Sequence, residues 1–156
     1  NFLNLMAEIA KIFDQVKGVN ELQRALDRLQ SAHEELGKIP ALLTDFAKSG
    51  KPGVLLQNAE PFLQLMGDLV AGWLLIQGAA IALEKLEGLY AEAGADTEDK
   101  RKSLAAENAE VAFYRGKVAS AKFFATEILA TVKARCAIIA EGETMAVDID
   151  EASFAI

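Results

Sequence analysis

The sequence predicts an all-α fold, an antiparallel bundle of about four helices with two long helices at its centre. Every long segment repeats its apolar residues with helical spacing, and no window alternates apolar and polar residues as a strand would. Only three prolines interrupt the 156 residues, of which 52% are apolar and 25% charged. This balance fits one domain of ordinary size, so we expect residues 1–156 to form a single helical bundle.

The N-terminal helix is predicted over residues 2–16, with Gly18 closing it. Its apolar stripe consists of Phe2, Leu5, Met6, Ile9, Ile12, Phe13 and Val16. Fully exposed, that stripe would form a larger apolar patch than soluble monomers usually carry. We therefore expect it to pack against the bundle or against a second copy of the chain.

A second helix follows, and Asn20 is predicted to cap its N-terminus. Gly37 and Pro40 are predicted to end or kink this helix, because a proline removes a backbone hydrogen bond. Residues 41–47 then form a further helical piece, and residues 49–53 form a turn.

The third helix is predicted to begin between residues 53 and 60. Asn58 would open a first turn that contains Pro61, since proline is tolerated there and costs about 3 kcal/mol deeper in a helix. The helix is expected to continue to about Ala93, with Gly94 as its stop.

A polar connection, residues 93–103, leads to the fourth helix. Asp96 is predicted to cap this helix, with Asp99 favourably placed near its positive end. The helix is then expected to run unbroken to about Ala140.

Residues 69–83 form the longest stretch without a charge, between Asp68 and Glu84, with Gln77 inside it. A bilayer core about 30 Å thick requires roughly 20 consecutive apolar residues, and membrane spans usually have basic flanks and aromatic belts. This stretch is too short and has neither feature, so we expect no integral membrane segment. We interpret it instead as a buried central helix.

Small residues recur along one face of the third helix and along a longer file on the fourth. The third helix carries Gly67, Ala71, Gly78 and Ala82, and the fourth carries Ala105, Ala109, Ala112, Gly116, Ala119, Thr126, Ala130, Ala134 and Ala137. Glycine within a helix costs roughly 0.5–1 kcal/mol relative to alanine, so glycines on one face favour close approach of another backbone. We expect the two faces to meet in an antiparallel pair, so that leucine at Gly78 or Gly116 would overpack the interface.

The charge balance and the cysteine content exclude several classes of protein. A net charge of −7 argues against nucleic-acid binding, which requires a basic face. The single cysteine, Cys136, excludes an internal disulfide and is compatible with a reducing compartment. Residues 1–30 carry mixed charge without the cleavage pattern of a signal peptide, so we expect a cytoplasmic location.

No set of residues in the sequence has the spacing of a catalytic or metal site. A di-iron bundle requires Glu-x-x-His on two helices, whereas the one histidine, His33, has Gln30 three residues before it. The Gly-Lys pair at residues 50–51 is not a phosphate-binding loop, because Pro52 stands where Ser or Thr is required. Cys136 lies in an apolar helical context that is typical of a core thiol. We therefore predict no catalytic, cofactor-binding or metal-binding residue in this chain.

Three segments resemble a known family: residues 61–83, 113–130 and 137–154. They are similar to the C-terminal helical domain appended to a subgroup of bacterial flavin-dependent acyl-CoA dehydrogenases. The shared features are a mid-helix tryptophan, a Phe-Tyr-x-x-Lys-x-Ala motif, and a glycine followed by an acidic stretch that ends in phenylalanine. They stand in this sequence as Trp73, Phe113, Tyr114, Lys117, Ala119 and Phe154. The resemblance covers roughly residues 53–154.

The resemblance implies that the flavin-binding regions and the catalytic glutamate precede this segment in a parent enzyme. It implies FAD in the parent chain, no FAD in this segment, and no catalysis by this segment alone. The chain would then be a fragment of a longer acyl-CoA dehydrogenase. Its partners would be the upstream catalytic domains and further copies of the chain in a homo-oligomer. Its role would be packing, subunit association or control of substrate access.

Two alternatives stay open at the level of sequence. The first is an autonomous all-α protein-interaction module that is unrelated to acyl-CoA oxidation. The second is peripheral membrane contact through an exposed apolar helix, although the acidic balance disfavours binding to anionic lipid.

Overall fold

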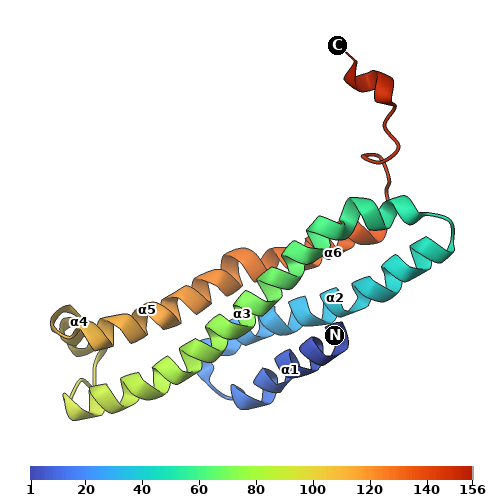
Figure 1. Cartoon of the computed structure of the whole chain (residues 1–156). Helices are drawn as coiled ribbons and strands as arrows, with labels where there is room; N and C mark the ends of the chain where they lie inside the picture. The colour runs from blue at the N-terminus through green and yellow to red at the C-terminus, as the bar shows by residue number, and fades with distance from the viewer. Residues whose placement is uncertain (156) are drawn as a thin grey trace.

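The all-α fold is confirmed by the computed structural model, which describes residues 1–155 (Figure 1). Helices α2 (Gln23–Lys48) and α3 (Pro52–Glu92) run antiparallel to each other. A third rod, formed by α5 (Ala109–Phe124) and α6 (Ala130–Glu141), returns along α3. These three rods make the body of the bundle, and no strand occurs in the described part of the chain.

Shorter elements complete the bundle. Helix α1 (Phe2–Gln15) packs against α2 and α3, and α4 (Glu98–Glu107) packs against α5 at the end where α3 finishes. Between α5 and α6 the rod widens into a π-helical segment, η2 (Ala125–Leu129). The 3₁₀ turn η1 (Asn20–Leu22) precedes α2, and the 3₁₀ turn η3 (Glu151–Phe154) lies near the C-terminus.

The apolar core lies between α1, α2, α3 and the α5–α6 rod. Its fully buried large side chains within these elements include Ile9, Ile12, Leu29, Leu36, Leu65, Leu69, Ile76, Val111, Val132 and Ile139. Burying one such side chain contributes about 1.5–3 kcal/mol, whereas an isolated helix is only marginally stable in water. Packing of these faces therefore stabilises the helices more than their intrinsic propensity does.

The prediction that the N-terminal stripe packs against the bundle is confirmed. Met6, Ile9 and Ile12 are buried in the core. On α2, the Nε2 atom of His33 lies 2.9 Å from the carbonyl oxygen of Met6, and the ring of Phe13 meets the imidazole edge-on with centroids 5.6 Å apart. His33 is therefore a packed side chain that joins α2 to α1.

Helix α2 continues through Gly37 and Pro40, so the prediction that it ends there is wrong. One α-helix runs from Gln23 to Lys48, and residues 41–47 are its last turns. Leu36 and Ile39 are buried on either side of Gly37. Their contacts with the core offset the roughly 3 kcal/mol that an interior proline costs a helix.

Helix α3 begins earlier than predicted. Pro52, rather than Pro61, occupies the first turn, directly after the reversal at Gly50, whose φ is +84°. Asn58 is buried and does not cap the helix; its side-chain amide donates to the carbonyl oxygen of Val54 at 2.9 Å. Pro61 lies inside the helix, between the buried Asn58 and the core residue Leu65.

Two predicted caps are also wrong. Asn20 opens η1, and the buried Leu22 occupies the N-cap position of α2 without a side-chain hydrogen bond. At α4, Thr97 is the N-cap and accepts from the backbone N–H of Lys100 at 3.4 Å. Asp96 instead accepts from the Lys100 ammonium at 2.6 Å.

Asn108 divides the predicted fourth helix into α4 and α5. Its backbone is extended (φ −122°, ψ 108°), and its Oδ1 accepts from the backbone N–H groups of Glu110 and Val111 at 2.9 and 3.2 Å. Asparagine forms such local caps readily, and this competes with continuing the helix. Asp99 does lie in the first turn of α4, and the rod ends at Glu141, close to the predicted end.

The small-residue faces of α3 and of the α5–α6 rod do not meet. The prediction of which face of α3 packs against the rod is therefore wrong. A β-carbon built on Gly67, Gly78 or Gly116 would have no atom within 4 Å. A β-carbon on Gly72 would lie only 2.7 Å from Cδ1 of Leu129. Instead, α3 turns inward the face that carries Leu65, Leu69 and Ile76, whose burial stabilises the bundle. Gly72 lies on that face and is the glycine that permits close approach.

Gly72 is therefore expected to be the sensitive glycine of α3. Gly72→Leu should lower the free energy of unfolding by about 1–3 kcal/mol, because the added side chain overpacks the contact with Leu129. Gly88 is exposed with open space around it, so Gly88→Leu should leave stability unchanged or raise it. Urea unfolding followed by circular dichroism measures both, and equal stability of the two variants would contradict the packing.

Candidate functional site

A polar depression of the surface lies where α3, α4 and α5 meet, with a volume of about 300 Å³. At its centre, Arg115 of α5 donates from Nη2 to Glu98 at 2.7 Å and from Nη1 to the hydroxyl of Tyr90 at 3.1 Å. The guanidinium carbon of Arg101 lies 4.7 Å from the centroid of the Tyr90 ring. This group ties the start of α4 to α3 and α5.

Two cations of this depression are paired with carboxylates, whereas Arg101 is held by a backbone carbonyl and the Tyr90 ring. The hydrogen bond from Arg115 lowers the pKa of Glu98 below its ordinary value of 4.5, and the same contact raises the pKa of Arg115. At the other side of the depression, Lys122 binds Glu21 at 2.8 Å. Arg101 donates from Nε to the carbonyl oxygen of Ala95 at 3.2 Å. We interpret the group as a structural clamp rather than as a binding site.

The depression is also a poor fit for a flavin. Its volume lies at the lower end of the roughly 300–1,000 Å³ that pockets for drug-sized ligands have, and FAD is larger than such ligands. Its lining contains neither histidine, cysteine nor serine. Among residues 1–155, no group of three or more His, Cys, Asp or Glu side chains is placed to hold a metal ion.

The Glu98 clamp should make stability depend on pH in the acidic range. Since the folded state lowers the pKa of Glu98, its contribution is present above the unfolded value near 4.5 and is lost as the pH falls below it. Glu98→Gln should therefore be less stable than the parent chain at pH 7, and the gap should narrow as the pH falls below the unfolded value near 4.5. Thermal unfolding at pH 7 and at a series of acidic pH values measures this, and a gap that does not narrow would contradict it.

Cys136 is confirmed as a buried thiol of α6. Burial, with a smaller effect of Glu35, raises its pKa from 9.0 to about 11, so the thiol stays protonated at neutral pH. Beside it, Arg135 donates to Asp68 of α3 at 2.6 Å and to Gln64 at 3.1 Å, which ties α6 to α3.

Cys136 should react slowly with thiol reagents in the folded chain. At pH 8, modification by an aromatic disulfide reagent is expected to be slower than that of a model thiol by at least tenfold, because the thiolate is scarce and the sulfur is covered. Addition of 6 M guanidinium, a denaturing concentration for most domains, should restore the full rate. Fast modification of the native chain would show that α6 is not packed as described.

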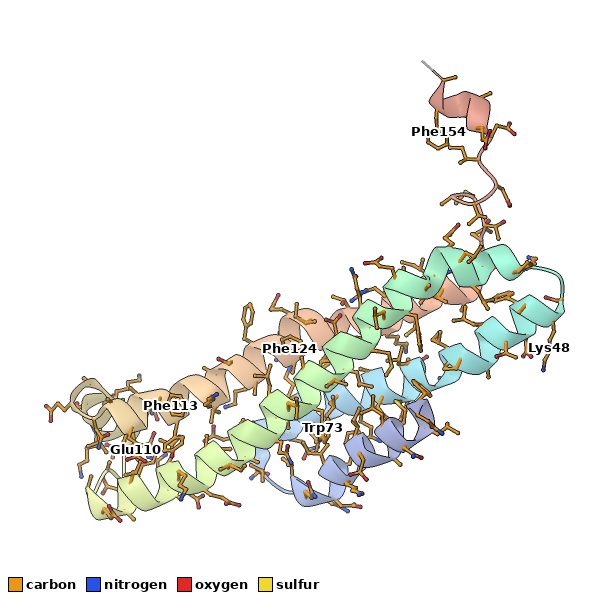
Figure 2. All side chains as sticks on the ribbon, viewed as in Figure 1. Lys48, Trp73, Glu110, Phe113, Phe124 and Phe154 are labelled. Carbon is orange, nitrogen blue, oxygen red and sulfur yellow. The ribbon has the colours of Figure 1, made fainter. Side chains whose placement is uncertain are left out.

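Two exposed apolar surfaces remain, and they are the stronger candidates for function. The first is the outer face of α5, which consists of Ala109, Ala112, Phe113, Gly116 and Phe123, all exposed. Figure 2 shows the ring of Phe113 near the α4 end of the rod and labels Phe124, which is partly buried, farther along it. The predicted small-residue file of the fourth helix therefore exists, but much of it faces outward.

The second surface lies on α3, on the side opposite to the core. Its large side chains are Leu56, Leu63, Leu74 and Ile81, which are 73%, 71%, 52% and 55% exposed. We call these residues, with Gly67 and Val70 between them, the outer stripe of α3. The interpretation of residues 69–83 as a buried helix thus holds for one face only. By length and composition α3 could cross a membrane, because an 18-residue window has a mean hydropathy of 1.6 and 33% of that window is buried. Core helices of soluble proteins can have the same length and hydropathy.

The C-terminal segment is a third apolar feature. After Gly142 the chain stands off from the bundle beside the start of α3, and Phe154 lies near its far end (Figures 1 and 2). The backbone N–H of Ala146 donates to Oε1 of Gln57 at 3.1 Å, which fixes the base of this segment. Beyond that base its apolar side chains are exposed, namely Met145, Val147, Ile149 and Phe154.

Comparison with known proteins shows the family of this chain. The sequence profile of the family described as "Acetyl-CoA dehydrogenase C-terminal like" matches residues 5–150. The chain belongs to this family. The match includes α1 and α2, so it extends beyond the residues 53–154 that carried the resemblance in the sequence.

A curated relative is similar over nearly the whole chain. It is the broad-specificity linear acyl-CoA dehydrogenase FadE5 of Mycobacterium tuberculosis (strain ATCC 25618 / H37Rv), 29% identical over 156 residues. The alignment covers 97% of this chain but 23% of the relative. The chain therefore spans less than a quarter of the length of that enzyme.

Proposed function

We propose that this chain is the non-catalytic C-terminal helical domain of a flavin-dependent acyl-CoA dehydrogenase, and that it packs against the catalytic domains of that enzyme. In this proposal the upstream domains bind FAD and carry out the oxidation of the acyl-CoA in the cytoplasm. The family match supports the placement, and the small share of the relative that is covered supports the presence of further domains.

The outer face of α5 is the observation that carries the packing role. It combines two large exposed rings, Phe113 and Phe123, with the exposed small residues Ala109 and Ala112 before Phe113 and Gly116 after it. Small residues allow a second backbone to approach closely, and rings beside them supply apolar area at low entropic cost. A contiguous apolar face of this kind usually marks an interaction site.

The charged clamp at the end of α5 fits this role. Arg115 and Glu98 fix α4 against the rod, so the outer face of α5 is presented on a rigid element. In this proposal the catalytic work is assigned to the upstream domains.

The proposal is tested by comparing the full-length gene product with the 156-residue chain alone. The full-length protein should be yellow and should oxidise acyl-CoA thioesters with an artificial electron acceptor, because it would hold an oriented flavin and a catalytic base. The isolated chain should be colourless, without turnover. Hydrogen exchange over residues 109–123 should be slower in the full-length protein than in the isolated chain.

A matched pair of substitutions tests the surface. Gly116→Glu places a charge in the outer face of α5 and should restore fast exchange over residues 109–123 in the full-length protein. Ala106→Glu adds the same charge at an exposed site on α4 and should not. A gene that encodes only this chain, or equal protection in both variants, would favour the autonomous interaction module instead.

A further inference from the structure

Together with Glu60 and Gln77, the residues of the outer stripe of α3 have the spacing of a coiled-coil interface. Successive positions are separated alternately by four and three residues, which is the heptad repeat of helices that pack along their length. We call these eight positions the seam, and they are Leu56, Glu60, Leu63, Gly67, Val70, Leu74, Gln77 and Ile81. The opposite face of the same helix supplies Leu65, Leu69 and Ile76 to the core, and of the seam positions Val70 is partly buried against that core.

The seam is also symmetric about a point between residues 68 and 69. Leu56 lies as far before that point as Ile81 lies after it, and Leu63 is related to Leu74 in the same way. The two inner positions, Gly67 and Val70, lie at equal distances on either side of this point. The two polar positions, residues 60 and 77, are related in the same way. A helix face with this symmetry is complementary to a second copy of itself that runs antiparallel.

The polar positions of the seam fit the same arrangement. In an antiparallel pair the carboxylate of Glu60 faces the amide of Gln77 of the other copy, which can donate a hydrogen bond to it. Glu60 already accepts a hydrogen bond from Gln64 one turn later, so its carboxylate is held along the helix. This layer occurs twice, once at each end of the symmetric seam.

The positions that flank the seam carry no charge between residues 57 and 80. On one side they are Gln57, Gln64, Ala71 and Gly78, and on the other Ala59, Met66, Trp73 and Ala80. Flanking charges of like sign would repel in a symmetric pair. Four of these flanking residues are small, namely Ala59, Ala71, Gly78 and Ala80, and Glu60 is the charged position of the seam itself.

We propose that the outer stripe of α3 binds the outer stripe of a second copy of this chain, as an antiparallel coiled coil with a twofold axis next to residues 68 and 69. A twofold interface is made by the same surface on both subunits, and such a surface must be complementary to itself. Binding to a lipid surface or to an unrelated domain does not require the residues along α3 to be arranged symmetrically. The proposal concerns α3 only and stands apart from the role assigned to the outer face of α5.

Cross-linking tests the direction and the register, with Cys136→Ala as the background for both the full-length gene product and the isolated chain. In the proposed pair residue 63 faces residue 74 of the other copy. Residue 63 of one copy and residue 63 of the other copy are then separated by 11 residues, which corresponds to roughly 16 Å along the helix axis. A bis-maleimide shorter than this separation should link a Leu63→Cys chain to a Leu74→Cys chain, and neither chain to itself.

Charge substitution tests the energetics by sedimentation equilibrium. Leu63→Glu or Leu74→Lys alone should raise the dimer Kd by roughly a hundredfold, because twofold symmetry places each change in the interface twice. A mixture of the two variants should associate again, since the glutamate then faces the lysine. Ile138→Glu, an exposed site on α6, is the matched control and should leave the Kd unchanged. Circular dichroism checks that every variant is folded.

Four results would overturn the proposal. They are a monomer at all concentrations, a dimer that Leu63→Glu does not weaken, a Leu63→Cys chain that links to itself, and a link that forms in the isolated chain but not in the full-length protein. Flotation of the chain with phosphatidylcholine vesicles that Leu63→Glu abolishes, together with a monomer in solution, would assign the stripe to a lipid surface instead. Selective linking of residue 63 to residue 74 in the full-length protein supports the proposal.

Discussion

The bundle depends on one constraint, that α3 is apolar on two opposite sides and reaches the whole length of the molecule. Its 41 residues correspond to roughly 60 Å of helix. The inner side, centred on Leu65, Leu69 and Ile76, determines where α2 and the α5–α6 rod must lie. Gly72 allows Leu129 to approach closely at the middle of that side. The other elements are arranged around this helix, and its second side is left exposed.

Charged pairs at the bundle surface position the helices along their axes. An apolar face with a repeating pattern tolerates a slip by one turn, whereas a pair of specific partners does not. Asp68 and Arg135 fix α3 against α6, and Glu98 and Arg115 fix α4 against α5. Exposed pairs of this kind contribute little to stability, about 0–1 kcal/mol each. Their value to the fold is therefore in selecting one alignment.

Helical spacing in the sequence was sufficient to predict the helices and the buried N-terminal stripe, because that spacing directly reflects burial. It failed at Pro40, Pro61 and Asn108, where local preference and tertiary packing compete. Core contacts prevailed at the two prolines, and the asparagine cap prevailed at Asn108. The exposed faces were missed for a different reason. A helix that is apolar all round does not indicate which side another helix covers, so the outer stripe emerged only from the rotation of α3.

The π-helical segment η2 has a consequence for how this rod tolerates change in length. Its first and last residues, Ala125 and Leu129, are buried and lie four residues apart, and the same four-residue step separates Ala121 from Ala125. In a regular α-helix two such steps would rotate the buried side by roughly 80° away from the core. The wider turn absorbs most of that rotation, so α6 still directs Val132 and Ile139 inward. A chain that lacked one residue at this point would close the wide turn to a regular α-helix and keep the same bundle.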